Sequence, residues 1–256
     1  MTDAVRTQEF RAIAVAHHAD RVVVTLNRPE VRNAIDQVMV DELHAVAAEL
    51  ERTPKILILI GSDGIFASGA DIGQLRERRR EDALRGVNST LFARLQALPM
   101  PVIVAVDGYA LGGGSELALA GDFRIGTPRI IVGQPETGLG IIAAAGALWR
   151  LKDIVGEPLA KDICLAGRRL DAEEALAAGY VTELHPPEEL LPAAHRLADR
   201  IARQDPLAVR LTKQVFHAPR EAHPMIDNIA QAICFESPAK FDRMEAFLQR
   251  TKEKNQ

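Results

Sequence analysis

The chain has 256 residues, 47% of them hydrophobic, which is enough for one large domain or for a domain with an appendage. Its formal net charge of −4 provides no general attraction to nucleic acid or to an anionic membrane. Two cysteines exclude a disulfide framework, and the seven histidines lack metal-binding spacing, so we expect no metal site.

The hydrophobic segments and the N-terminus indicate where such a chain resides. The apolar runs at 56–60, 102–106 and 141–149 are far too short to span a bilayer. The first 13 residues have no apolar signal-peptide core, and the early Asp3 and Glu9 argue against a transit peptide. We therefore expect a soluble, cytoplasmic protein.

Strands and helices alternate in the first half of the chain. Residues 13–15 and 21–26 predict a hairpin, and a helix with one apolar face is expected over about 33–51. A buried strand at 55–60 then enters a loop of small residues, 61–73. Such a loop brings its backbone close to a ligand, although an ordinary surface turn explains it equally well.

The next stretch, residues 74–86, is helical and rich in arginine. A solvated helix face is the simpler interpretation, and arginines that meet ligand phosphates are the alternative. Leucines at 91, 95 and 98 mark a further helix that Pro99 ends.

The most informative stretch is 101–122, PVIVAVDGYALGGGSELALAGD. It predicts a buried strand at 102–106, then a glycine triplet, Gly112 to Gly114, that leads into a short helix carrying Glu116 in its first turn. Free N–H groups at a helix N-terminus favour negative charge. Amides that stabilise an anion beside an acid–base group suit carbonyl activation, whereas the ordinary alternative is a Gly-rich turn with a glutamate that complements the helix dipole.

The glycines do not fit the common nucleotide or hydrolase motifs. Their spacing is not G-x-G-x-x-G, no Lys-Ser/Thr pair follows, and the glycine that would close a nucleophile elbow is missing. The function therefore has to be sought in another class of site.

A second carboxylate follows two short strands at 123–125 and 130–132. Glu136 comes after a proline and among glycines, and a salt bridge within the loop is its ordinary interpretation. Helices are expected at 161–166, from Asp171 as a cap, and at about 192–203, 206–217, 223–236 and 238–252, with a short strand at 179–184. Strands alternating with helices predict an α/β fold followed by a helical tail, with a boundary near 186–195.

Together these motifs resemble the enoyl-CoA hydratase/isomerase, or crotonase, superfamily across nearly the whole chain. The matching stretches are LNRPEVRNAI (26–35), IFASGADI (65–72), 101–122, GQPETGLG (133–140), LAGRRLDAEEALAAGYV (165–181) and PLAVRLTKQ (206–214). Their order and spacing make the resemblance specific.

The resemblance implies a spiral of ββα repeats over residues 1–190, followed by a helical oligomerisation region over 191–256. It implies a homotrimer or a dimer of trimers that binds acyl-CoA thioesters. Neither a cofactor nor a metal is implied, since CoA is part of the substrate. No nucleic-acid or membrane partner is expected.

The resemblance also assigns the site. An oxyanion hole falls on the backbone N–H groups of Ala70 and Gly113, and the acid–base groups fall on Glu116 and Glu136. The loops 28–32 and 67–72 would line the CoA path. The substrate-binding residues implied are Arg28, Val31, Arg32, Ala67, Ser68, Ala70, Asp71, Ile72, Gly112 and Gly113.

Two retained glutamates favour hydration of a 2-enoyl-CoA to a 3-hydroxyacyl-CoA, because one carboxyl group can take a proton from water while the other supplies one. Isomerisation of the double bond is the alternative within the family. Outside enzymes, an inactive acyl-CoA sensor, an RNA-binding relative or an assembly subunit are alternatives. The segment 141–151 departs from the family's T-I-P-G-A-G-G-T-Q-R-L pattern, which leaves the preferred acyl chain open.

Overall fold

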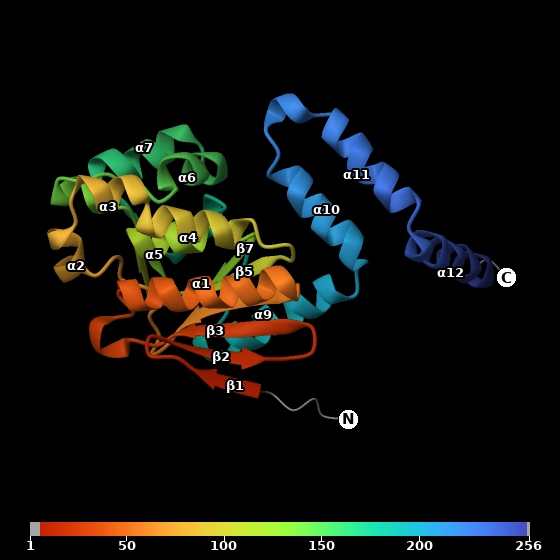
Figure 1. The fold of residues 1–256 in the computed structure, drawn as a ribbon, viewed down its shortest axis with the longest axis horizontal. Helices are drawn as coiled ribbons and strands as arrows, with labels where there is room; N and C mark the ends of the chain where they lie inside the picture. The colour runs from red at the N-terminus through yellow and green to blue at the C-terminus, as the bar shows by residue number, and fades with distance from the viewer. Residues whose placement is uncertain (1–5, 255–256) are drawn as a thin grey trace. The chain divides into compact units, whose positions relative to one another are not determined.

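The structure, a computed structural model, describes residues 6–254. It divides into two compact units, Met1–Asp199 and Arg200–Gln256. The first unit contains a six-stranded sheet in the order β1-β2-β3-β4-β5-β7 (Figure 1). Its strands are β1 (Arg6–Glu9), β2 (Ile13–His17), β3 (Arg21–Leu26), β4 (Ile56–Gly61), β5 (Val102–Val106) and β7 (Phe123–Gly126).

The sheet changes from antiparallel to parallel along this order. β1, β2 and β3 pair antiparallel, whereas β3, β4, β5 and β7 pair parallel. All five residues of β5 are buried, which agrees with its unbroken apolar sequence, because a strand covered on both faces needs no polar alternation. The carboxyl ends of β4 and β5 therefore lead to the same edge of the sheet.

A second, three-stranded sheet has the order β6-β8-β9. It consists of β6 (Tyr109–Leu111), β8 (Ile131–Gly133) and β9 (Arg169–Leu170). β6 and β8 are parallel, and each immediately precedes one of the predicted catalytic segments. This small sheet thus fixes the glycine triplet and the Gln134-Pro135-Glu136 segment side by side.

Helices of the first unit complete its core. α1 (Gln37–Arg52) begins at Asp36, whose side chain accepts a hydrogen bond from the Met39 amide at 2.8 Å. α4 (Val87–Gln96) packs against α1 and against α5 (Gly113–Leu119). The remaining helices are η1 (Pro29–Val31), α2 (Ile72–Glu77), α3 (Arg80–Arg85), η2 (Glu136–Leu139), α6 (Ala147–Val155), α7 (Glu157–Ala166) and α8 (Ala172–Ala177).

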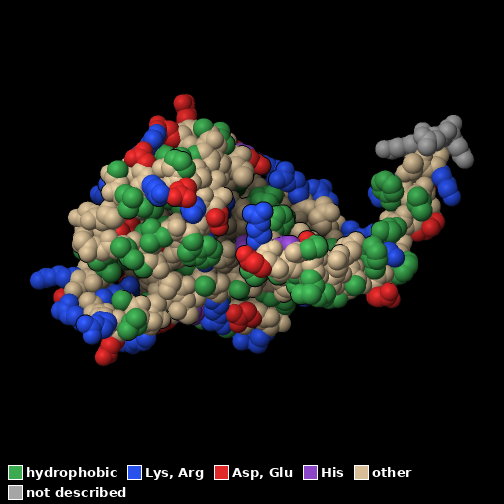
Figure 2. All heavy atoms as spheres, turned by 90° about the horizontal axis from the view of Figure 1, so that it is seen from above, with side chains coloured by type: hydrophobic (Ala, Val, Ile, Leu, Met, Phe, Trp, Pro, Cys, Tyr) green, Lys and Arg blue, Asp and Glu red, His purple; other side chains and the backbone are tan. Residues whose placement is uncertain are grey.

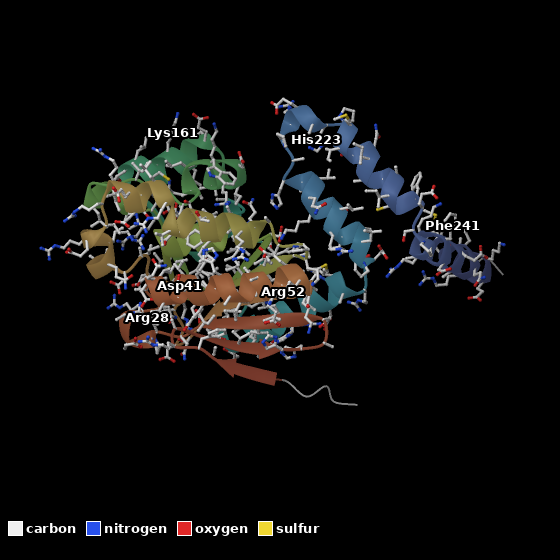
Figure 3. All side chains as sticks on the ribbon, viewed as in Figure 1. Arg28, Asp41, Arg52, Lys161, His223 and Phe241 are labelled. Carbon is white, nitrogen blue, oxygen red and sulfur yellow. The ribbon has the colours of Figure 1, made fainter. Side chains whose placement is uncertain are left out.

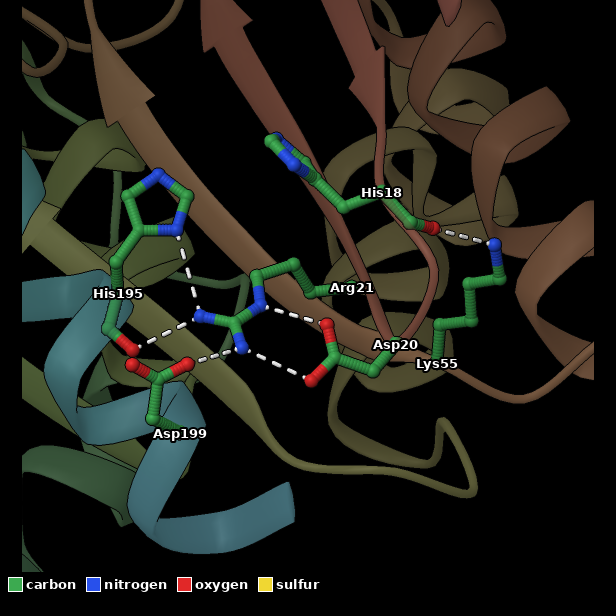
Figure 4. A network of polar contacts seen from close by, with 6 residues as sticks. All are labelled: His18, Asp20, Arg21, Lys55, His195 and Asp199. Carbon is green, nitrogen blue, oxygen red and sulfur yellow. Dashed lines mark hydrogen bonds and ion pairs between the residues drawn. The ribbon is translucent and has the colours of Figure 1, made fainter. Parts of the chain in front are cut away.

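A polar network fastens α9 (Pro187–Ala202) to the start of β3 (Figure 4). Arg21 donates to both carboxylate oxygens of Asp20, at 2.8 and 2.9 Å, and to the backbone oxygen of His195 at 2.8 Å. It also pairs with Asp199. Because the Arg21 residue is only 8% exposed, these acceptors satisfy a cation that is largely removed from solvent.

The second unit is helical. It holds α10 (Pro206–Phe216), η3 (Arg220–Ala222), α11 (Met225–Phe235) and α12 (Pro238–Lys254). Within residues 6–254 no helix is long and apolar enough to cross a membrane. The predicted boundary at 190 falls inside α9, and the assignment of the tail to oligomerisation stays a prediction.

Most expected elements form, with shifted bounds. The helix predicted at 33–51 starts only at Gln37, because Asn33 is a turn residue with a φ of +54° and Ile35 bridges Ala70. The charged stretch 74–86 is divided between α2 and α3 by the extended residues Arg78 and Arg79. The strand predicted at 179–184 is wrong: Leu184 makes a single bridge to Gly126 there, and no strand forms.

Candidate functional site

The structure brings the two predicted oxyanion-hole residues together. Ala70 lies in the loop after β4, and Gly113 is the first residue of α5. A Cβ atom placed on Gly113 would lie 3.4 Å from the amide nitrogen of Ala70. Among residues 6–254, neither amide donates to a protein acceptor. Two N–H groups without a protein acceptor thus lie close together.

Close backbone packing brings these two segments together and explains the glycines. Ala67 and Leu111 pair, with the Leu111 amide donating to the Ala67 oxygen at 3.1 Å, so the loop after β4 lies beside β6. A Cβ on Gly114 would come within 2.2 Å of that same oxygen. Only glycine permits the loop and the start of α5 to approach so closely.

Glu116 is held by backbone amides of a distant segment. The residue is 3% exposed, and its Oε1 accepts hydrogen bonds from Ala145 N at 2.7 Å and Ala147 N at 3.1 Å. Burial raises the pKa of this carboxyl group, while the two amides and the charge of Arg150 oppose that rise. These donors stabilise the ionised form, so Glu116 can act as a base.

Glu136 is also buried, but it lacks the amide donors that Glu116 has. It is 8% exposed, and its Oε2 is enclosed with no hydrogen-bond partner among the described residues. Burial raises its pKa to about 7, and the charge of Glu116 adds to the shift. A Cβ on Gly112 would lie 2.7 Å from Glu136 Oε1, so this carboxyl group is next to the oxyanion amides. Glu136 can therefore carry a proton near neutral pH.

Arg150 on α6 supports the amides that hold Glu116. Its Nη1 donates to the Ala145 oxygen at 3.0 Å, and its Nε and Nη2 donate to Gln96 Oε1 at 2.9 and 2.6 Å. The guanidinium also stacks at 4.0 Å over the Trp149 ring. Burial lowers the pKa of Arg150 to about 10, so it stays charged at neutral pH.

The predicted CoA-binding loops adjoin each other. The amide of Ser68 donates to the Arg32 oxygen at 3.1 Å, which joins the 28–32 loop to the 67–72 loop. Arg28 (labelled in Figure 3) forms ion pairs with Asp36 at 3.3 Å and Asp71 at 3.6 Å. These carboxylates neutralise part of the charge of Arg28. The ion pair between Arg28 and Asp71 also holds the two loops together.

Other members of that set differ in exposure. Ala67 is fully buried, so its side chain contributes packing, whereas Ile72 is 60% and Val31 38% exposed. Exposed apolar side chains such as these can lie against a ligand's apolar surface. Figure 2 also shows basic side chains gathered at the end of the first unit where α2 and α3 lie.

Three polar residues at or beside the site were missed from the sequence. Arg150 occurs where the family pattern places an arginine, which is the signal that could have revealed it. Asn33 is fully buried and donates to the Ser62 and Ile65 oxygens, at 3.2 and 2.6 Å, which fixes the loop before Ala70. Asn88 gives no local signal, because only the fold brings α4 to Gly113.

The arrangement has a clear chemical capability. Two backbone N–H groups can bind one carbonyl oxygen, and preorganised donors of this kind each contribute about 3 kcal/mol to stabilising a developing oxyanion. Beside them lie one carboxyl group stabilised as the anion and one with a pKa near neutrality. Such a pair can take a proton from a water that attacks one carbon of a bound thioester and can supply a proton to the adjacent carbon.

Known proteins share this sequence and fold. Residues 18–256 match the Enoyl-CoA hydratase/isomerase family. The chain is 34% identical to a short-chain-enoyl-CoA hydratase of Clostridium acetobutylicum, over 95% of this chain and 97% of that protein. It is 35% identical to a crotonyl-CoA hydratase of Syntrophomonas wolfei, over 90% and 92% of the two chains.

The fold agrees as closely. The crystal structure of an enoyl-CoA hydratase from Bacillus anthracis superposes with a TM-score of 0.88 at 30% identity, covering 94% of this chain and 97% of that one. The expected crotonase-like α/β fold is thereby confirmed. From the family match, the relatives and the shared fold, the chain belongs to the enoyl-CoA hydratase/isomerase family.

Proposed function

We propose that this protein is an enoyl-CoA hydratase that adds water across the 2,3 double bond of a 2-enoyl-CoA. The observation that carries the proposal is the pair of buried glutamates beside two unpaired amides. Relatives named as short-chain-enoyl-CoA and crotonyl-CoA hydratases support it. An isomerase needs only one proton carrier, whereas hydration needs a base and an acid together.

The amides of Ala70 and Gly113 would bind the thioester oxygen and stabilise the enolate that forms when water attacks C3. Glu116, held as an anion by Ala145 and Ala147, would accept the proton from that water. Glu136, whose pKa lies at about 7, would supply the proton to C2. As water bonds to C3, the pair of the C2–C3 double bond forms the C1–C2 bond of the enolate and the carbonyl pair moves to the oxygen. The carbonyl re-forms when C2 takes its proton, and passage of a proton from Glu116 to Glu136 restores the starting state.

The protein would bind its substrate largely through the CoA part of the thioester. The joined loops 28–32 and 67–72 lead to Ala70, and the exposed Val31 and Ile72 offer apolar contact along that path. No cofactor or metal takes part in the proposed steps, because amides and carboxyl groups supply every proton and charge. We also propose that the enzyme works in the cytoplasm, where acyl-CoA thioesters and free thiols such as its two cysteines are both maintained.

Oligomerisation through the second unit is part of the proposal. Large apolar side chains of α11 and α12 are exposed, including Met225 at 66% and Phe247 at 63%. Large apolar side chains exposed together on a helix favour association with another apolar surface. A trimer, or a pair of trimers, is the expected assembly.

Purified protein should consume crotonyl-CoA, measured as loss of the enoyl-thioester absorbance, and form the 3-hydroxyacyl product. Glu116→Gln and Glu136→Gln keep each side chain's shape but remove its acid–base function, so each should lower kcat by at least about 10²-fold. Glu77→Gln, on α2, is the matched control and should retain activity. A product with a shifted double bond and no added water would favour isomerisation instead.

A further inference from the structure

The side-chain amide of Asn88 lies beside Gly113 and Ala70, whose backbone amides have no protein acceptor. Asn88 is the second residue of α4 and comes from neither of the loops that carry Ala70 and Gly113. A Cβ atom placed on Gly113 would lie 3.5 Å from Asn88 Nδ2 and 3.4 Å from Ala70 N. Two nitrogen donors from separate segments, Ala70 N and Asn88 Nδ2, therefore lie within 3.5 Å of one point beside Gly113.

The Asn88 amide is not satisfied within the protein. Its Oδ1 is enclosed and has no hydrogen-bond partner among the described residues. Its Nδ2 also donates to no acceptor within residues 6–254, yet it is not one of the enclosed atoms, so the NH₂ group is the part of the amide that remains open. An open NH₂ group with no acceptor in the protein can donate to the oxygen of a bound ligand.

Neighbouring polar residues on the same helix behave differently. Ser89 Oγ donates to the Gly86 oxygen at 3.1 Å, and Thr90 Oγ1 donates to the Arg85 oxygen at 3.3 Å. Their hydroxyl groups cap the preceding turn and have a local structural purpose. Asn88 has no such contact, although it occupies the same first turn of α4.

We propose that Asn88 is a third oxyanion donor, whose Nδ2 hydrogen-bonds the thioester oxygen together with the amides of Ala70 and Gly113. This inference rests on the proposed function, since it needs a thioester at that point. A side-chain amide is a suitable donor because it is neutral and does not lose its proton to the enolate. Its contribution is largest when the oxygen carries the most charge, so it acts mainly on kcat.

The test compares Asn88→Leu, which keeps the size but removes the donor, with Asn88→Asp, which replaces the donor by a carboxylate. Both should lower kcat for crotonyl-CoA on the order of 10²-fold while changing KM little, with the aspartate the worse of the two. Ser89→Ala is the matched control and should keep wild-type kcat. Should Asn88→Leu fail to fold, Asn88→Ser, which cannot reach the oxygen, takes its place.

A second measurement separates donation from structure. An enolisable 3-ketoacyl-CoA bound to the protein reports the stability of its enolate by absorbance, without turnover. Loss of a donor that stabilises the bound enolate by 10²-fold should raise the apparent pKa of that ligand by about 2. An unchanged ligand pKa together with a kcat within twofold of wild type would overturn the role of Asn88. If the wild-type protein itself neither hydrates nor enolises these ligands, the proposed function fails instead.

Discussion

At the scale of single residues, the two glutamates differ in how their charge is supported. Glu116 accepts two amide hydrogen bonds and feels the positive charge of Arg150. Glu136 has an enclosed oxygen with no partner among the described residues, and it feels the negative charge of Glu116. Burial raises the pKa of both carboxyl groups, but only Glu116 has amide donors from a distant segment and a nearby cation that oppose the rise.

This difference predicts the pH dependence of hydration. The reaction needs Glu136 protonated, and the protonated fraction falls as pH rises through its pKa of about 7. Initial rates over a pH series should therefore show kcat/KM falling above about pH 7, up to tenfold per pH unit. Glu136→Gln should abolish this limb in whatever activity remains. A wild-type profile that stays flat to pH 9 would show that Glu136 is not the acid.

Arg150 should affect the acidic limb of the same kcat/KM profile. Its charge lowers the pKa of Glu116, so Arg150→Met should raise that pKa and move the acidic limb of kcat/KM to higher pH. Arg150→Lys keeps a cation and should move the limb less. Arg124→Met is the matched control, because this buried arginine also donates to backbone oxygens, those of Tyr180 and Gly121, at 2.8 and 2.7 Å. An equal shift in the Arg124 variant would make the effect a general loss of stability.

The sequence predicted both glutamates and both oxyanion residues through its resemblance to the family, because each occurs within a short motif, and these roles stay predictions. It did not identify the partners that set their chemistry. Ala145 and Ala147 hold Glu116 through backbone N–H groups, which any residue except proline would supply. Asn88 acts across a long sequence separation and no local pattern reveals it. Arg150 occupies the position of the family's arginine, but its contacts with Gln96 and Ala145 become visible only in the fold.

At the scale of elements, the site depends on how tightly the start of α5 packs on the loop after β4. Each residue of the glycine triplet is glycine for a different reason. Gly112 has a φ of +49°, Gly113 lies beside the Ala70 amide, and a Cβ on Gly114 would clash with the Ala67 oxygen. Alanine substitutions along the triplet should therefore have separable effects.

Gly113→Ala should fold, because its Cβ would lie 3.4 Å from the nearest atom, but the methyl group would occupy the space of the thioester oxygen. We expect kcat/KM to fall on the order of 10²-fold with little change in melting temperature. Gly114→Ala should instead lower the melting temperature, since its Cβ would come within 2.2 Å of a backbone oxygen. Thermal melts and steady-state rates measure both, and the reverse pattern would contradict this geometry.

Long, regular elements were predictable and short ones were not. β5 and α1 show clear apolar patterns and form close to their expected positions. β6 has three residues and β9 has two, too few to show any periodicity, and they form because neighbouring segments pair with them. The segment 179–184 has strand-forming residues but gains only one bridge, so tertiary pairing overrides its local preference.

At the scale of the whole molecule, the second unit offers its own exposed apolar surface. Phe241, Met244 and Phe247 on α12 are each more than half exposed. If these side chains join copies of the chain, Phe247→Glu combined with Phe241→Glu should shift the protein toward monomers in sedimentation velocity. Glu245→Lys, on the same helix, tests whether a change of charge alone has that effect. A wild-type protein that sediments as a monomer would contradict the proposed assembly.

The most direct test of the proposed chemistry is the fate of water oxygen. Crotonyl-CoA incubated with the protein in ¹⁸O-labelled water should give 3-hydroxybutyryl-CoA that carries one ¹⁸O atom, as measured by mass spectrometry. Glu116→Gln and Glu136→Gln should each slow its formation by at least about 10²-fold. Turnover to a product without ¹⁸O, or labelling at the wild-type rate in either variant, would contradict hydration by this pair of glutamates.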